Sequence, residues 1–145
     1  MSVDVHESAA SRLRNSDQRY TTNRRAIVEA LSAAERPVTV PELLERAERM
    51  PQSSVYRNIG LLEDAGIVHR IVGGDEYARY ELAEDLTEHH HHHLICSTCG
   101  AVEDVTLPPT LERAVESALK RAARRRSFEG SHHRLDLMGV CEGCR

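Results

Sequence analysis

His89-His90-His91-His92-His93-Leu94-Ile95-Cys96-Ser97-Thr98-Cys99-Gly100 combines five consecutive histidines with a Cys-x-x-Cys pair. Its Cys-x-x-Cys pair recurs once, at Cys141 and Cys144, and the two pairs contain all four cysteines. Four thiols form the ligand set of a closed tetrahedral zinc site, and a glycine follows or interrupts each pair, as in a zinc knuckle. We therefore predict that a structural zinc ion holds the C-terminal half together through Cys96, Cys99, Cys141 and Cys144.

Disulfides or a redox-active pair would use the same cysteines differently. No charged and apolar leader pattern begins the sequence, and no apolar run approaches the ~18 residues of a membrane span, so we expect a reducing cytoplasm and no membrane partner. Disulfides are disfavoured in that compartment. A redox Cys-x-x-Cys pair usually occurs once rather than twice, which again favours zinc.

The five consecutive histidines lead directly into the apolar residues Leu94 and Ile95, which is typical of a strand rather than of an affinity tag. Alternate side chains of a strand share a face, so His89, His91 and His93 would point one way and His90 and His92 the other. One strand could therefore serve two metal sites. In the plainer alternative, only two or three of these histidines bind metal and the others are solvated. Because imidazole loses metal on protonation, occupancy should depend on pH.

The composition constrains the partners and the size of the core. The chain has 145 residues, five aromatic side chains and a net charge of −4. A small domain with so little aromatic area needs added stabilisation, for which metal and oligomerisation are the usual means. The net charge counts mildly against a nucleic-acid partner. However, arginines gather near the N-terminus, at Arg12, Arg14, Arg19, Arg24 and Arg25.

The N-terminal half predicts a winged helix-turn-helix over residues 11–82, after a polar and unpatterned segment, 1–10, that we expect to be disordered. One helix begins at Thr21 or Thr22, and a capping box of Thr39 and Glu42 opens a second. A third follows Pro51 and ends at Gly66. A β-hairpin then covers residues 67–72 and 77–82, with a turn at 73–74.

In a winged helix the third helix enters the major groove, where hydroxyl, guanidinium and amide groups contact phosphates and base edges. Candidate DNA-binding residues on this helix are Ser53, Ser54, Tyr56, Arg57 and Asn58, and we expect Ser54, Arg57 and Asn58 to face outward. The alternative is an ordinary solvated helix face.

After residue 82 the pattern changes to that of a small α/β unit over residues 83–145. We predict strands over 91–96, 101–107 and 133–140, and a helix over 110–126 that begins after Pro108-Pro109. The chain is thus predicted to be α+β, with a DNA-binding winged helix followed by a zinc-bound α/β domain.

The string His91-His92-His93-Leu94-Ile95-Cys96-x-x-Cys99-Gly100, with Ser131-His132-His133 and Gly139-Val140-Cys141-x-x-Cys144, closely resembles the ferric uptake regulator family. In the N-terminal half, Thr21-x-Asn23-Arg24, Ser54-Val55-Tyr56-Arg57 and Ala65-Gly66-Ile67-Val68 also match, so the resemblance covers residues 12–145. It implies a homodimeric, metal-dependent repressor whose winged helix binds palindromic operator DNA and whose α/β domain dimerises. It also adds Arg19, Thr21, Asn23 and Arg24 to the expected DNA contacts.

The resemblance implies two further metal sites besides the cysteines. The regulatory site would use His69, Glu81, His91 and His93. An additional site would use His90, His92, Glu112 and His133, with Asp104 assigned to it although it could lie near either. These sets agree with the strand alternation derived above. Metal held between wing and α/β domain would fix their relative orientation and so select the DNA-competent state.

The sequence departs from the family pattern at two places. Arg36-Pro37 stands where many members have a histidine ligand, and His69 is our candidate to complete the regulatory site. The segment 48–52, before the third helix, is shorter than usual, which affects the expected operator geometry.

The metal that is sensed is the least determined feature. The histidine-rich run favours zinc, and so a repressor of metal-uptake genes, whereas iron(II) and manganese(II) accept the same ligands at higher coordination number. An iron-dependent peroxide sensor is a further alternative, against which Glu81 argues because it is not an aspartate. A zinc hydrolase is disfavoured because neither H-E-x-x-H nor H-x-x-E-H occurs, so we expect no enzyme activity and no small-molecule substrate. A metal-storage protein would not need the helix-turn-helix.

Overall fold

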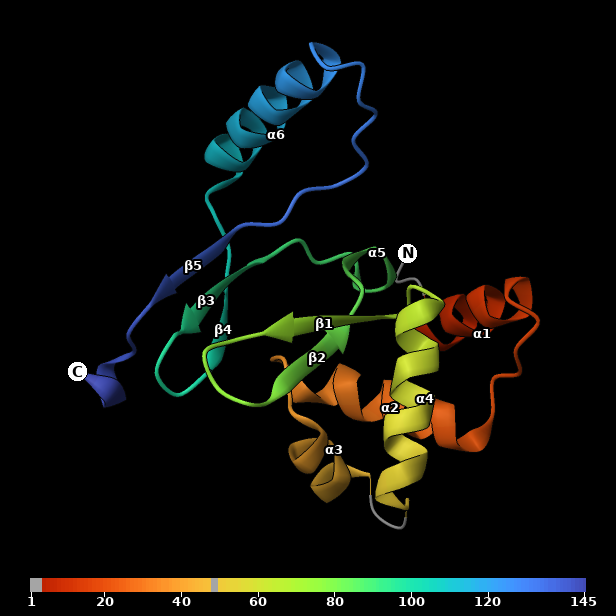
Figure 1. Ribbon diagram of the computed structural model, residues 1–145. Coiled ribbons are helices and arrows are strands. Elements are labelled where there is room, and N and C mark those ends of the chain that lie inside the picture. Colours follow the sequence, from red (N-terminus) through yellow and green to blue (C-terminus); the bar gives the residue numbers. More distant parts are fainter. Residues whose placement is uncertain (1–3, 48–49) are drawn as a thin grey trace.

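The computed structural model describes residues 4–47 and 50–145 and shows helices followed by a hairpin and then a second α/β unit (Figure 1). The order of the predicted elements is confirmed. The N-terminal elements are α1 (Val5–Asn15), α2 (Thr22–Ala34), α3 (Val40–Arg46), α4 (Gln52–Asp64), β1 (Val68–Val72) and β2 (Ala78–Leu82).

The first helix, α1, corrects the prediction of disorder over residues 1–10. The Asp4 side chain caps it by accepting a hydrogen bond from the His6 backbone N–H at 2.9 Å. Ala9 and Leu13 are fully buried in the main core, so packing rather than a strong periodic pattern orders this segment. Residues 1–3 of the segment lie outside the described residues, as do positions 48 and 49 of the shortened segment before α4.

The caps of the next three helices follow the sequence closely. Thr21 accepts a hydrogen bond from the Arg24 backbone N–H at the start of α2, and both bonds of the predicted capping box between Thr39 and Glu42 form at α3. Gly66 has a φ of +72°, the left-handed conformation that ends α4. These helices enclose one apolar core with fully buried Ile27, Val28, Leu43, Val55, Leu62 and Ile67.

The wing is the antiparallel hairpin of β1 and β2, in which His69 pairs with Glu81. Its tip lies against the first zinc knuckle, because a Cβ added at Gly74 would overlap the backbone of Ser97. Ile71 of β1 also packs with Ile95 and Val102 in a second apolar cluster. The wing therefore packs against the C-terminal sheet both at its tip and through Ile71.

A short helix that was not predicted, α5 (Glu84–Thr87), joins the wing to the C-terminal unit. A three-stranded sheet follows in the order β4-β3-β5, with β3 (His92–Cys96) antiparallel to β4 (Val102–Val105) and parallel to β5 (Asp136–Gly139). Between β4 and β5 the chain forms α6 (Pro109–Arg124), and a 3-10 turn, η1 (Glu142–Cys144), ends it. The strand predicted over 133–140 is thus shorter than expected.

Helix α6 extends away from the sheet in Figure 1, and none of its residues is buried within the single chain. Apolar side chains are exposed on α6 at Leu111 and Leu119 and on and beside β5 at Leu137, Met138 and Val140. Across residues 4–47 and 50–145, no helix combines the length and apolar character needed to cross a membrane.

Candidate metal centres and DNA-binding surface

The four cysteines converge where β3 and β5 end side by side. Their four Sγ atoms lie within 4.8 Å of one another, as expected for ligands of a shared metal ion. The backbone N–H groups of Cys99 and Cys141 donate to Cys96 Sγ at 3.5 and 3.4 Å, and they lower the pKa of this thiol to about 6. A thiol held as thiolate near neutral pH is suited to zinc.

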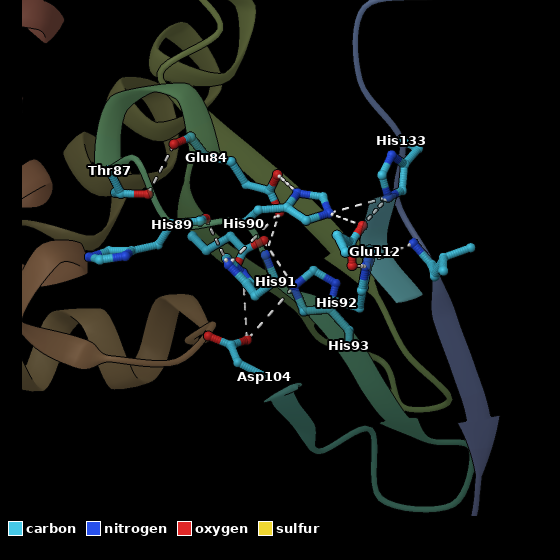
Figure 2. Close-up of polar contacts among 12 residues, drawn as sticks. Glu84, Thr87, His89, His90, His91, His92, His93, Asp104, Glu112 and His133 are labelled. Carbon is cyan, nitrogen blue, oxygen red and sulfur yellow. Dashed lines mark hydrogen bonds and ion pairs between the residues drawn. The ribbon is translucent and has the colours of Figure 1, made fainter. Parts of the chain in front are cut away.

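One histidine cluster joins Glu81 of β2 with His91, His93 and Asp104, and its four ligand atoms also lie within 4.8 Å of one another. Glu81 Oε2 lies 2.9 Å from His91 Nε2, and Glu81 Oε1 lies 3.0 Å from His93 Nε2. Asp104, on β4, approaches both imidazoles at 3.7–3.8 Å (Figure 2). The wing and the C-terminal sheet therefore contribute to one site, which we call the regulatory cluster.

The donors of the regulatory cluster fit a cation. His93 Nε2 is buried and makes no hydrogen bond of good geometry, although the Glu81 carboxylate lies 3.0 Å away. On its other side, His93 Nδ1 lies 3.2 Å from Asp136 Oδ1, which orients the ring. Burial raises the pKa of Asp104, although the His91 ring opposes this. A metal ion would both satisfy the buried nitrogen and compensate the two carboxylates.

The regulatory cluster differs from the predicted ligand set in two residues. Asp104 belongs to this cluster rather than to the additional site, because its position on β4 pairs it with His93. His69, although opposite Glu81 in the hairpin, is not among the clustered ligands. Burial lowers the pKa of His69, and the nearby Arg134 lowers it further, so this ring lies beside a competing cation.

The other histidine cluster contains His90, His92, Glu112 and His133, as predicted apart from Asp104. Glu112, in the first turn of α6, lies 2.8 Å from His90 Nε2 and 2.9 Å from His92 Nε2, and it also contacts His133. Burial opposes ionisation of Glu112, but hydrogen bonds from the three histidines outweigh it and lower the pKa to about 2. We call this group the second cluster.

The alternation predicted for the histidine run holds for His90 to His93, although β3 begins only at His92. His91 and His93 belong to the regulatory cluster and His90 and His92 to the second cluster. His89 is in neither group and points away from Glu112 and His133 in Figure 2. Four of the five histidines are thus placed to bind metal.

An open cavity of about 1260 Å³ lies beside the regulatory cluster, lined by residues of α1, α2 and the cluster itself. Arg36 lines this cavity but its guanidinium pairs with Glu42 at 3.2 Å. The residue that replaces the expected histidine is therefore engaged in stabilising the start of α3 and supplies no metal ligand.

The predicted DNA-binding residues divide into exposed and internal groups. Five side chains are exposed on α4, on the start of α2 and on the loop before it: Arg19, Thr21, Asn23, Ser53 and Arg57. Tyr56 is 48% exposed beside Arg57. The exposed hydroxyl, phenol and guanidinium groups of α4 form a polar surface of the kind that can read a DNA groove.

Asn58 does not face outward as predicted. It is buried, its side-chain amide donates to the Ser54 carbonyl at 2.8 Å, and its Oδ1 accepts from Arg24 Nε at 3.1 Å. Arg24 also donates to the Arg19 carbonyl. One turn of α4 thus contributes Tyr56 and Arg57 to the surface but directs Asn58 at α2, which the sequence pattern of polar residues did not distinguish.

Comparison with known proteins agrees with this architecture. The model of the ferric uptake regulator family matches residues 15–138. The chain belongs to the ferric uptake regulator family. The match includes the winged helix and both histidine clusters, and it ends just before the second cysteine pair.

Individual members of the ferric uptake regulator family are similar over nearly the whole chain. The peroxide-responsive repressor PerR of Staphylococcus epidermidis is 31% identical, over 98% of this chain and 91% of its own length. The ferric uptake regulator Fur of Vibrio cholerae is 28% identical, with a TM-score of 0.69 and coverage of 95% and 100%. A zinc-bound manganese uptake regulator is 34% identical, with a TM-score of 0.62 and coverage of 95% and 99%.

Proposed function

We propose that this family member is a metal-responsive transcriptional repressor that binds palindromic operator DNA as a homodimer when its regulatory cluster holds a divalent metal. One observation carries the proposal: the ligands of the cluster come from both parts of the chain, Glu81 from the wing and His91, His93 and Asp104 from the C-terminal sheet. A metal ion bound there would join the two parts in one orientation.

The regulatory effect follows from how a dimer reads a palindrome. Two recognition helices must be separated by the distance between half-sites, and that distance depends on how each winged helix is oriented on the dimerisation unit. Without metal, Glu81 and Asp104 place two carboxylates within 4.8 Å of one another. Their repulsion disfavours the arrangement in which the wing and the C-terminal sheet meet at the regulatory cluster. A cation removes that repulsion and shifts the population toward the DNA-binding state.

The second copy of the chain would cover the apolar surface of α6 and β5. Leu111, Leu119 and Leu137 are between 44% and 67% exposed in the single chain. Helix α6 has an apolar stripe without a partner in its own chain, and burying such a stripe against a second copy is the usual route to a stable homodimer.

The donor sets favour different metals in different clusters. Four thiols suit zinc as a structural ion. The sequence favoured zinc, but Asp104 adds a second carboxylate to the regulatory cluster. Two imidazoles, two carboxylates and no thiol form a set that suits iron(II) or manganese(II). We therefore favour one of these as the sensed metal. Zinc is the second candidate, because four ligand atoms within 4.8 Å also match a tetrahedral ion.

A regulatory rather than enzymatic role fits both the family and the site. The relatives compared above are regulators and repressors by name. A reducing cytoplasmic location, expected from the cysteine pattern, would keep the four thiols available for zinc.

Metal identity is tested by titrating the chelator-treated dimer with zinc, iron(II) or manganese(II) without oxygen, at buffered free-metal concentrations. Binding to a fluorescent palindrome selected from random DNA is followed by anisotropy. Activation by iron(II) or manganese(II), with zinc confined to the cysteines, supports the proposal. Activation by zinc alone would favour the second candidate, and DNA binding that ignores metal would exclude a metal-responsive repressor. Release of the iron-loaded protein by peroxide would assign it the response of its staphylococcal relative.

A further inference from the structure

Glu84 contacts residues of both histidine clusters but is a ligand in neither. Its Oε2 lies 2.8 Å from His90 Nδ1, and its Oε1 accepts a hydrogen bond from the His91 backbone N–H at 3.2 Å (Figure 2). The same Oε1 is 3.8 Å from His91 Nδ1. The Glu84 side chain is only 19% exposed, so it is a partly buried carboxylate with a defined position.

These contacts determine which ring nitrogens face the clusters. His90 Nδ1 faces Glu84 and His90 Nε2 faces Glu112 and His133, so a metal ion in the second cluster would take Nε2 while Glu84 holds Nδ1–H. The bond to the His91 backbone fixes the point from which that ring reaches Glu81, at 2.9 Å from its Nε2. A carboxylate that holds the outer nitrogen of a metal-binding histidine strengthens and orients the ligand. Glu84 has this role for the ring of His90 and holds His91 through its backbone N–H, while His91 Nδ1 lies 3.3 Å from the His89 carbonyl oxygen.

Helix α5, which carries Glu84, packs as part of the DNA-binding unit. Ala83 and Leu86 are each 1% exposed, and both belong to the main apolar core with α1, α2 and α4. The Ala83 backbone N–H also donates to the Ile67 carbonyl, just before the wing. A change in the position of Glu84 is therefore transmitted to the core of the winged helix.

A direct polar path continues from α5 to the end of the recognition helix. Asp85, next to Glu84, accepts from Arg12 Nη2 at 2.6 Å, and Arg12 Nη1 donates to the carbonyl of Gly66 at 2.6 Å. Gly66 is the residue that ends α4. The backbone of α5, which carries both Glu84 and Asp85, and the Arg12 side chain thus join the histidine clusters to the C-terminal end of α4.

We propose that Glu84 is a positioning residue that couples the two histidine clusters to each other and, through α5 and Arg12, to the recognition helix. This inference rests on the proposed function for the regulatory cluster and adds that the second cluster also binds metal. In this proposal α5, between the two units, connects metal binding to the winged helix. Arg36 cannot make that connection, because it supplies no metal ligand. Metal in either cluster would order His90 or His91 and hence Glu84, which presents the other cluster with an already oriented ligand.

The test uses cobalt(II) as a probe and two variants that each leave one cluster intact. His133→Ala disables the second cluster, and His93→Ala disables the regulatory cluster without altering His91. Affinity for cobalt(II) is measured by competition with a fluorescent chelator in the zinc-loaded dimer, with and without Glu84→Gln. Removal of such a supporting carboxylate typically weakens metal binding about 10- to 100-fold. We expect that loss in both backgrounds, whereas Glu88→Gln, an exposed glutamate at the end of α5, should leave both affinities unchanged.

A second readout follows the link to the DNA-binding unit without using DNA. Cobalt(II) should slow hydrogen exchange of the α5 amides in the wild-type dimer, and Glu84→Gln should remove that slowing while the circular dichroism and dimer mass stay unchanged. A loss confined to one cluster, or to neither, would overturn the coupling. Unchanged α5 exchange on metal binding would overturn the link to the winged helix. Failure of wild type to bind cobalt(II) outside the cysteines would overturn the proposed function as well.

Discussion

Asn58 Oδ1 accepts a hydrogen bond from Arg24 Nε at 3.1 Å, which joins the recognition helix α4 to the first turn of α2. Because the amide of Asn58 also donates to the Ser54 carbonyl, both ends of this buried side chain are used. Arg24, whose other bond is to the Arg19 carbonyl, holds the loop before α2 in the same network. The angle between these two helices is therefore fixed by polar contacts in addition to the apolar core.

Asn58→Ala should lower the free energy of unfolding by about 1–3 kcal/mol, because it leaves the half-buried Arg24 guanidinium with an unsatisfied donor. It should also weaken DNA binding, since the recognition helix loses a fixed angle. Urea unfolding followed by circular dichroism checks the first effect and anisotropy the second. Asn23→Ala is the matched control, because Asn23 is exposed and its loss should change stability by less than about 0.5 kcal/mol. Equal stability of the two variants would contradict this role.

Cys96→Ser combined with Cys99→Ser should remove one zinc ion per chain and abolish cooperative unfolding of the C-terminal unit. Structural zinc supplies folding free energy outright, and the β3 knuckle also supports the wing tip. Zinc content by atomic emission, together with thermal melting, checks this. Ser97→Ala, in the same loop, should retain its zinc. A doubly substituted chain that keeps its dimer mass and melting transition would show that the cysteines are not structural.

Stability of the chelator-treated protein should depend on pH through Glu81 and His93. Burial lowers the pKa of His93, but Glu81 and Asp136 outweigh it and raise the pKa above the ordinary 6.5. Burial raises the pKa of Glu81, but His93 and His91 outweigh it and lower the pKa below the ordinary 4.5.

The sign of each effect follows from linkage. The raised pKa of His93 contributes stability that is complete below pH 6.5 and is lost as the pH rises through the higher pKa of the folded state. The lowered pKa of Glu81 contributes stability that is present above pH 4.5 and is lost on acidification. The melting temperature of metal-free protein should therefore be highest between these values and fall toward pH 8. His93→Ala should flatten this decline. A melting temperature that rises toward pH 8 would contradict the assignment.

Gly74→Ala should destabilise the contact between the wing tip and the zinc knuckle by about 1–3 kcal/mol, because the new methyl group would overlap the Ser97 backbone. Gly60→Ala provides the opposite case within α4. Apart from its chain neighbours and the nearby backbone of α4, no atom lies within 4 Å of a Cβ at Gly60, so alanine should stabilise the helix by about 0.5–1 kcal/mol. Urea unfolding of both variants measures the difference. A neutral Gly74→Ala would show that the wing tip does not bear on the knuckle.

Local patterns predicted the helix caps, the hairpin and the cysteine cluster because each depends on residues close in sequence or on a distinctive ligand type. The capping box at Thr39 and Glu42 and the left-handed Gly66 are examples. The division of the histidine run also followed from the alternation expected of an extended chain, although only His92 and His93 lie in β3. Helix α1 was missed because only a few apolar residues, such as Ala9 and Leu13, mark its buried face.

Residues whose role depends on tertiary placement were harder to assign. Asp104 and His69 both had a suitable side chain for the regulatory cluster, and only the pairing of β3 with β4 brings Asp104 to it. Asn58 and Arg57 are adjacent polar residues, yet one faces α2 and the other solvent. In the sequence Glu84 is one of several acidic residues before the histidines. Its contacts with His90 and His91 depend on the position of α5 in the fold.

The central claim, that metal in the regulatory cluster controls DNA binding, is tested most directly by comparing His91→Ala with His89→Ala. Both remove one imidazole from the same run, but only His91 is in the cluster. Operator affinity is measured by anisotropy with and without saturating metal, after dimer mass and cysteine-bound zinc are shown to be unchanged. We predict that His91→Ala loses the metal-dependent gain in affinity while His89→Ala keeps it. Equal metal-dependent gains in the two variants would contradict the account.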